Sequence, residues 1–165
     1  MKIAVLLENT ACAGGIGAAH GLSLYLETPG HKLLFDMGPN AAFAGNAQAM
    51  GVDLGAVDTA VLSHGHYDHA GGLDLFCRRN SAAGIYVQAA ALAPCWSAGK
   101  GEPRYIGVPR SGLAHRDRFI LCRGDRRIDG ELLLFSSVTG EAFPTAANRT
   151  LLMEGPEGLV PDTFA

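Results

Sequence analysis

The chain has 165 residues, a formal net charge of −3, 48% hydrophobic residues and 18% charged residues. This composition excludes intrinsic disorder, and the length is enough to bury a hydrophobic core as one domain of ordinary size. The acidic balance argues against a nucleic-acid partner, and no apolar run approaches the roughly 20 residues that a transmembrane helix needs.

The first part of the chain is predicted to be rich in strands. Residues 2–7 form a continuous aliphatic run that is typical of a buried strand. Apolar residues alternate through residues 20–27, a Thr-Pro-Gly turn follows at 28–30, and residues 32–36 are again apolar up to an aspartate. This pattern predicts a β-hairpin.

Helices and strands alternate in the following segments. The predicted elements are a helix over 40–50 with Asn40 as its N-cap, a buried strand over 57–63, short helices over 72–79 and 89–95, and strands at 85–87, 119–122 and 132–138. The order β-β-β-α-β-α-β predicts a layered α/β or α+β domain over the whole chain, 1–165. Residues 97–130 are rich in glycine, proline and arginine and are expected to be a basic insert.

Four cysteines are spread through the chain at positions 12, 77, 95 and 122. They form no C-x-x-C pair and no signal peptide precedes them, so we expect reduced thiols and a cytoplasmic protein. No histidine or asparagine accompanies any of them in a pattern typical of a cysteine nucleophile.

Three of the six histidines fall within residues 64–69, directly after a predicted buried strand. In an extended chain His64 and His66 project to the same side, while Asp68 and His69 lie where the chain turns into a helix. Gly71 and Gly72 leave room for that tight turn. Imidazole and carboxylate ligands suit zinc, and also iron or manganese, so the segment predicts a site for one or two metal ions.

The pattern His64-x-His66-x-Asp68-His69 resembles the signature of the metallo-β-lactamase fold superfamily. The resemblance implies a four-layer αββα sandwich in which His64 and His66 bind one metal ion and Asp68 and His69 a second. Asp36 resembles the strand-end aspartate that supports the metal loop in this family, although Met37 departs from the usual sequence after it. The implied activity is hydrolysis of an ester, lactone or phosphodiester by a metal-bound hydroxide.

A finer resemblance rests on the segments around Glu8-Asn9 and His20-Gly21. They are similar to a subgroup described as dihydropterin ribofuranosylaminobenzene phosphate synthase, which implies a small anionic substrate of phosphorylated pterin or ribose type. Asp68 and His20 are the predicted catalytic residues. For His20, contact with substrate, orientation of the site and a purely structural role all remain open.

Later ligands of the resembled family are missing from the expected places. Only His115 follows His69, and its sequence context predicts a surface histidine. We therefore expect weak metal binding and only the N-terminal half of the sandwich, plus the basic insert. Half a sandwich leaves an apolar sheet face in water, which predicts a homodimer or a fragment of a longer protein.

Weaker patterns suggest further roles. Arg116 and Arg118 could hold an anionic substrate, although ordinary solvated charge is the simpler interpretation. The glycine-rich segment 13–21 suggests a dinucleotide fingerprint, but a strand and not a helix follows it. Finally, the chain could be a metal-binding or interaction module that has kept the loop and lost catalysis.

Overall fold

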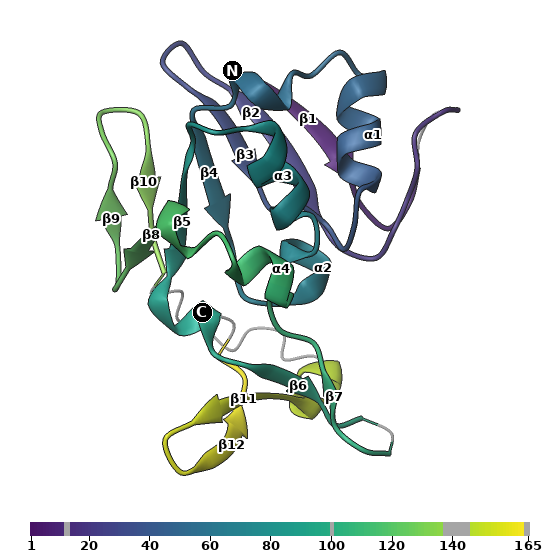
Figure 1. The fold of residues 1–165 in the computed structure, drawn as a ribbon, viewed down its shortest axis with the longest axis vertical. Coiled ribbons are helices and arrows are strands. Elements are labelled where there is room, and N and C mark those ends of the chain that lie inside the picture. Colours follow the sequence, from purple (N-terminus) through teal and green to yellow (C-terminus); the bar gives the residue numbers. More distant parts are fainter. Residues whose placement is uncertain (12–13, 100, 137–145, 164–165) are drawn as a thin grey trace.

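The computed structural model describes residues 1–11, 14–99, 101–136 and 146–163. Its largest element is a six-stranded sheet in the order β1-β2-β3-β4-β5-β8 (Figure 1). The strands are β1 (Lys2–Leu7), β2 (Ser23–Glu27), β3 (Lys32–Phe35), β4 (Thr59–Leu62), β5 (Gly84–Gln88) and β8 (Phe119–Cys122). The first three strands pair antiparallel, and β3, β4, β5 and β8 are parallel to one another.

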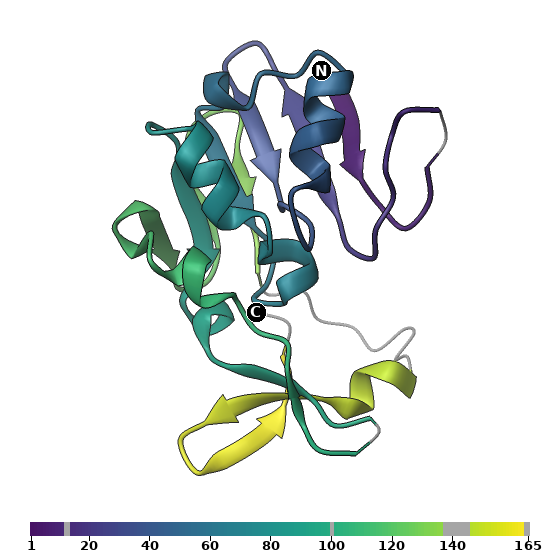
Figure 2. The ribbon, with the colours of Figure 1, turned by 45° about the vertical axis from the view of Figure 1, so that its right-hand side comes forward.

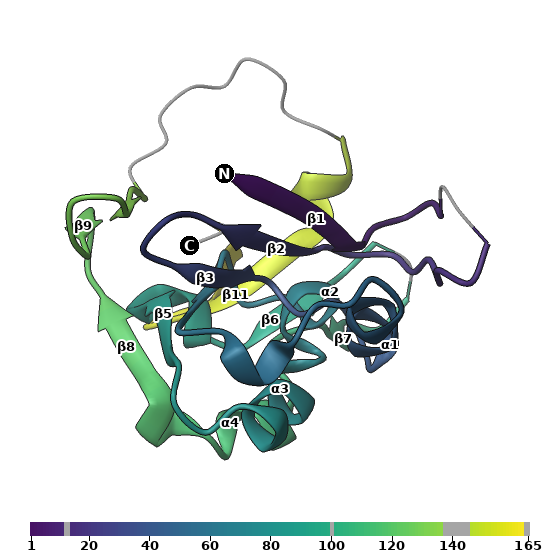
Figure 3. The ribbon, with the colours of Figure 1, turned by 90° about the horizontal axis from the view of Figure 1, so that it is seen from above.

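Helices cover one face of this sheet, as the view from above shows (Figure 3). The α-helices are α1 (Ala42–Ala49), α2 (Tyr67–Ala70), α3 (Leu73–Arg79) and α4 (Arg110–Leu113), and the 3₁₀ turns are η1 (Leu54–Ala56), η2 (Ala89–Leu92), η3 (Arg116–Arg118) and η4 (Ala146–Thr150). Fully buried side chains of the strands, such as Leu34 and Ile85, pack with Phe43 of α1 and Phe76 of α3 in one core cluster. The predicted layered α/β fold is confirmed.

The opposite face of the sheet is apolar and only partly covered by the described residues. Cross-strand partners share a face, and the register pairs Ile3 with Leu26, Val5 with Leu24, and Leu24 with Phe35. Ile3 and Val5 are 54% and 46% exposed, and the other three are half-buried. We call these five residues the open face.

Two smaller sheets complete the fold. One has the order β12-β11-β6-β7 and lies beyond the end of the main sheet that carries α2 (Figure 2). Its strands are β6 (Cys95–Ser97), β7 (Arg104–Tyr105), β11 (Leu151–Gly155) and β12 (Gly158–Pro161). The other is the two-stranded hairpin of β9 (Arg126–Arg127) and β10 (Leu133–Leu134).

The β9–β10 hairpin is attached to the main sheet through His31, in the turn between β2 and β3. His31 Nδ1 lies 3.0 Å from an oxygen of Asp58, and Nε2 lies 2.5 Å from an oxygen of Asp129 in the hairpin. Glu131, also in the hairpin, accepts a hydrogen bond from the Thr28 hydroxyl. The pKa of His31 is raised, most by its hydrogen bond to Asp58 and next by its hydrogen bond to Asp129.

Most predicted elements agree with the structure, and two differ. The predicted helix over 89–95 is a 3₁₀ turn followed by strand β6. The predicted strand over 132–138 is two residues long, and its last two positions lie outside the described residues. Within residues 97–130, expected to be a basic insert, the predicted strand at 119–122 is present as β8 and pairs with β5.

Within the described ranges, no helix is both long and apolar enough to cross a lipid bilayer. Of the four cysteines, Cys12 lies outside these ranges, and the other three are buried and form no disulfide.

Candidate metal centre

The loop that carries the histidines lies at one edge of the main sheet. It leaves the carboxyl end of β4 at Ser63, and His66 caps the short helix α2, which contains Asp68 and His69. Because β3 is parallel to β4, Asp36 emerges at the same edge. This edge, at the carboxyl ends of parallel strands, is where α/β proteins commonly bind ligands.

The loop follows its path because glycines admit other backbone segments at very short range. A Cβ atom on Gly65, between His64 and His66, would collide with the carbonyl oxygen of Ala91. A Cβ atom on Gly71 would collide with the carbonyl oxygen of Pro39. The sequence predicted a tight turn at Gly71 and Gly72, but the contacts that require glycine at positions 65 and 71 are both with segments distant in sequence.

The predicted metal-binding side chains come together at this edge. The ring centroids of His64 and His66 are 4.6 Å apart, and those of His64 and His69 are 4.2 Å apart. Asp68 Oδ2 lies 3.7 Å from His69 Nε2. Three imidazoles and a carboxylate form a donor set that suits zinc.

Asp36 holds the loop from the end of β3. Its buried carboxylate accepts hydrogen bonds from the backbone N–H and the hydroxyl of Ser63, at 2.8 and 2.7 Å. His69 Nδ1 lies 2.7 Å from the same carboxylate, which leaves Nε2 on the side of Asp68. Asp36 was predicted to support the loop, and in the structure its carboxylate contacts the loop at Ser63 and His69. Met37, the departure from the usual sequence, is fully buried in the core.

The protonation of the imidazoles follows from burial and neighbouring charge. Burial lowers the pKa of His64 to about 4, and the nearby His69 and His66 add to this effect. Burial also acts to lower the pKa of His69, but the hydrogen bond and charge of Asp36 outweigh it and the pKa is raised. His64 is therefore neutral at neutral pH, as a metal ligand must be.

His20 lies beside the loop, on the segment that enters β2. Its Nε2 is 3.4 Å from Asp68 Oδ2, and its Nδ1 is 3.2 Å from the side-chain oxygen of Asn9. Asn9 also accepts a hydrogen bond from the backbone N–H of Gly21. The two segments that suggested a finer resemblance thus meet next to Asp68, and the exposed His20 ring can reach a molecule bound there.

The two arginines considered as substrate contacts lie on one 3₁₀ turn, η3. The Arg118 guanidinium donates to the carbonyl oxygens of Asn80 and Ala83, at the opposite edge of the sheet before β5. Arg116 is exposed on the same 3₁₀ turn. Arg118 thus supports the start of β5, and the exposure of Arg116 fits the simpler interpretation of solvated charge.

Of the remaining histidines, His115 contacts Asp74 of α3 at 2.9 Å and His31 contacts Asp58 and Asp129. Neither joins the loop within the described residues. His115 was predicted as a surface histidine, and it is partly buried where it contacts Asp74.

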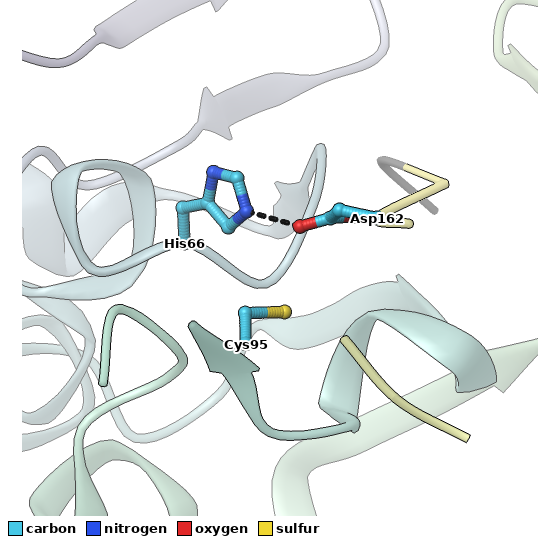
Figure 4. Close-up of side chains that lie close together, drawn as sticks. All are labelled: His66, Cys95 and Asp162. Atoms are coloured by element: carbon cyan, nitrogen blue, oxygen red, sulfur yellow. Dashed lines mark hydrogen bonds and ion pairs between the residues drawn. The ribbon is translucent and has the colours of Figure 1, made fainter. Parts of the chain in front are cut away.

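Two residues near the loop were not predicted. Asp162, just after β12, lies 2.6 Å from His66 Nε2, and Cys95, the first residue of β6, lies close to both (Figure 4). Burial, together with the charge of and hydrogen bond to Asp162, raises the pKa of the Cys95 thiol to about 12. Local sequence gave no signal for this cluster, because its members come from three distant segments.

Comparison with known proteins identifies a family and related chains. The family model described as Metallo-beta-lactamase superfamily matches residues 16–150. An uncharacterized protein of Methanocaldococcus jannaschii is 38% identical over 71 residues, which are 43% of this chain and 27% of that protein. The chain thus spans about a quarter of the curated relative that it matches.

Solved metallo-β-lactamases are similar to this chain. The crystal structure of SMB-1 in a complex with mercaptoacetic acid is 21% identical, with a TM-score of 0.52 over 81% of this chain and 51% of that one. Rm3 metallo-beta-lactamase is 27% identical, with a TM-score of 0.47 over 73% of this chain and 46% of that one. The chain covers about half of each. With a family model matched over most of its length and the histidine loop at the expected sheet edge, the chain belongs to the metallo-β-lactamase superfamily.

Proposed function

We propose that this chain is a metal-dependent hydrolase of esters, lactones or phosphodiesters, with zinc held by His64, His66, Asp68 and His69. The observation that carries the proposal is the convergence of these four side chains at one sheet edge, with Asp36 bound to His69. Zinc in such a site acidifies a bound water and so supplies a nucleophile at neutral pH.

The protein's own residues would prepare the reaction. Ser63 lies 2.9 Å from His64 Nδ1 and Asp36 lies 2.7 Å from His69 Nδ1, so both rings are held through one nitrogen. His20 lies within reach of Asp68 and is largely exposed, so it can orient a substrate or transfer a proton at its Nε2.

The proposed substrate is a small anionic molecule of phosphorylated pterin or ribose type. Its support is the resemblance around Asn9 and His20, whose side chains are in contact beside Asp68. Arg116 and Arg118 contribute nothing to this proposal, because they lie at the other edge of the sheet. The proposed compartment is the cytoplasm, where thiols stay reduced.

A second copy of the chain is the proposed partner. The open face exposes Ile3 and Val5 in the middle of a strand, where an apolar surface is normally covered. A homodimer that joins two open faces would bury this surface.

The competing function is a module that binds metal without catalysis. It is favoured by the ligand count, since within the described residues His31 and His115 are held elsewhere by aspartates. Two ions that shared His64, His66, Asp68 and His69 would each lack the three protein ligands that catalytic zinc sites use.

Metal content tests the proposal first. Purified protein loaded with zinc is expected to retain near-stoichiometric metal by mass spectrometry, and His66→Ala is expected to lose it. His115→Ala removes a histidine outside the loop and should keep the metal. An empty wild-type protein would contradict metal-dependent function altogether.

Hydrolysis separates the two candidates. Zinc-loaded wild type is expected to cleave bis-para-nitrophenyl phosphate or a para-nitrophenyl ester faster than His66→Ala by at least about tenfold. Stoichiometric metal with no turnover on either substrate or on a lactone would favour the non-catalytic module.

A further inference from the structure

A buried cluster beside the histidine loop, residues 64–69, contains His66, Cys95 and Asp162. Their potential ligand atoms all lie within 4.8 Å of one another. His66 and Cys95 are 6% and 4% exposed, and the Asp162 side chain is 4% exposed. The cluster joins the residue before α2, the first residue of β6 and the residue after β12 (Figure 4). It could bind a metal ion itself, or Asp162 could hold the His66 ring through a hydrogen bond.

The distance between His66 and Asp162 decides between these arrangements. Two ligand atoms on one tetrahedral zinc ion, each about 2.0 Å from it, are about 3.3 Å apart. His66 Nε2 and Asp162 Oδ2 are 2.6 Å apart, which is a hydrogen-bond distance for a charged acceptor. Asp162 therefore binds the imidazole itself.

Cys95 is placed as a packing residue in this cluster. Its Sγ donates to the backbone carbonyl of Ala93 at 3.4 Å, and its residue is almost fully buried at the start of β6. A thiol that donates a hydrogen bond retains its proton, whereas a zinc ligand is a thiolate.

The other two imidazoles of the loop are also held by an oxygen atom at one ring nitrogen. His64 is held at Nδ1 by Ser63, and His69 is held at Nδ1 by Asp36. A metal-binding histidine typically presents its second nitrogen to an oxygen acceptor, which fixes the tautomer and the ring orientation. His66 follows this rule with the nitrogens exchanged, since Nε2 faces Asp162 and Nδ1 lies on the ring edge turned away from it (Figure 4).

We propose that Asp162 is a positioning residue of the metal centre: its carboxylate accepts the Nε2–H of His66 and so presents Nδ1 as the metal ligand. This inference rests on the proposed metal-dependent function, and it makes the C-terminal hairpin part of the site. The hairpin comprises β11 and β12, whose end carries Asp162.

Zinc affinity of the full chain, measured by chelator competition, tests the proposal. Asp162→Asn is expected to weaken zinc binding by about 10- to 100-fold, the usual effect of losing such a partner. Glu154→Gln, an exposed substitution on the same hairpin, and Cys95→Ala should leave the affinity within about twofold of wild type. Equal affinities for Asp162→Asn and Glu154→Gln would overturn the proposal.

Cobalt substitution tests the other arrangement of the cluster. The Co²⁺ spectrum of wild type is expected to show no thiolate-to-cobalt charge-transfer band, and Asp162→Asn should change the visible bands of the bound ion. A charge-transfer band that disappears in Cys95→Ala would overturn the proposal in favour of a Cys95-containing metal site.

A metal-free measurement keeps the inference separate from the proposed function. Long-range ¹H–¹⁵N NMR spectra of the metal-free protein should show His66 with its proton on Nε2, and Asp162→Asn should lose this preference. A proton on Nδ1 in wild type would overturn the inference even if zinc binds. If zinc does not bind but the Nε2–H tautomer is found, the proposed function fails while the His66–Asp162 contact stands.

Discussion

Asp36 combines an unusual backbone with a buried charge. Its φ angle is 60°, in the left-handed region that residues other than glycine seldom adopt, and its side chain is fully buried. The Ser23 hydroxyl donates to its carbonyl oxygen, while its carboxylate holds Ser63 and His69. Such backbone strain is maintained only where the surroundings fix the residue, which is common at functional sites.

Neutralising Asp36 should impair metal binding while preserving the shape of the side chain. In Asp36→Asn an amide replaces the carboxylate that accepts from His69, so His69 loses its charged partner. We expect zinc affinity to fall by about 10- to 100-fold in chelator competition. Asp53→Asn changes an aspartate that caps η1, and should keep wild-type affinity. Unaltered zinc binding in Asp36→Asn would show that Asp36 does not orient the ligand.

Candidate site residues can be proposed from the sequence where the signal is local, and the structure brings those proposed at residues 64–69 together at one sheet edge. His64, His66, Asp68 and His69 lie within six positions, and Asp36 ends a recognisable strand. Asp162 could not be predicted, because its contact spans 96 residues and depends on how a second sheet docks. The role of Arg118 could not be predicted either, because a local run of basic residues does not reveal that its guanidinium donates to carbonyl oxygens before β5.

At the scale of elements, the short helix α2 depends on close packing of the loop before it. The Gly65 backbone lies so near the Ala91 carbonyl that no side chain fits between them. Ala91 belongs to η2, the connection between β5 and β6. The loop and this connection therefore fix each other's position.

A methyl group at position 65 should disturb both segments. Gly65→Ala is expected to lower the free energy of unfolding by about 1–3 kcal/mol, as overpacking does, and to weaken zinc binding. Gly45→Ala is the matched control, because Gly45 is exposed within α1 and has open space around it. That control should be neutral or stabilising by up to about 1 kcal/mol. Urea unfolding compares the two, and equal stability would contradict the packing argument.

The attachment of the β9–β10 hairpin should depend on pH. The pKa of His31 is raised above its ordinary 6.5 by Asp58 and Asp129, so the folded protein binds the proton more tightly than the unfolded chain. The resulting stabilisation is fully present below pH 6.5 and is lost as the pH rises through the raised value. Urea unfolding of wild type and His31→Gln should therefore differ most at mildly acidic pH and converge at alkaline pH. A constant difference between about pH 5 and pH 9 would contradict this linkage.

Elements were predictable where their partners are near in sequence. The strands and helices from β1 to β5 follow from hydrophobic periodicity, and they agree with the structure to within a few residues. The helix predicted over 89–95 was wrong because Pro94 forces extended backbone at Ala93, and because β6 pairs with β11 from the end of the chain. Nothing local in the sequence around Cys95 indicates that partner.

At the scale of the whole molecule, the main sheet has helices on one face and the open face on the other (Figure 3). The family resemblance predicted half of a sandwich, and the chain spans 51% of SMB-1, which shares its fold. The sequence could not reveal how the second sheet lies, because its strands are short and its pairings join residues far apart.

Association through the open face can be measured directly. Sedimentation velocity is expected to show a concentration-dependent dimer for wild type and a monomer for Val5→Glu, because a charge there must be desolvated on association. Leu121→Glu is the control: Leu121 is 49% exposed, similar to Val5, but lies on edge strand β8 with its side chain on the other face. A monomeric wild type at high concentration would refute the dimer.

The contact between His66 and Asp162 also has a consequence for biosynthesis. A growing chain can pair β1 to β5 early, but residue 66 meets its carboxylate only after residue 162 has left the ribosome. The histidine loop therefore gains this contact only after all strands from β1 to β12 have been made. A nascent chain stalled before residue 162 would fold β1 to β5 but lack the carboxylate that holds His66.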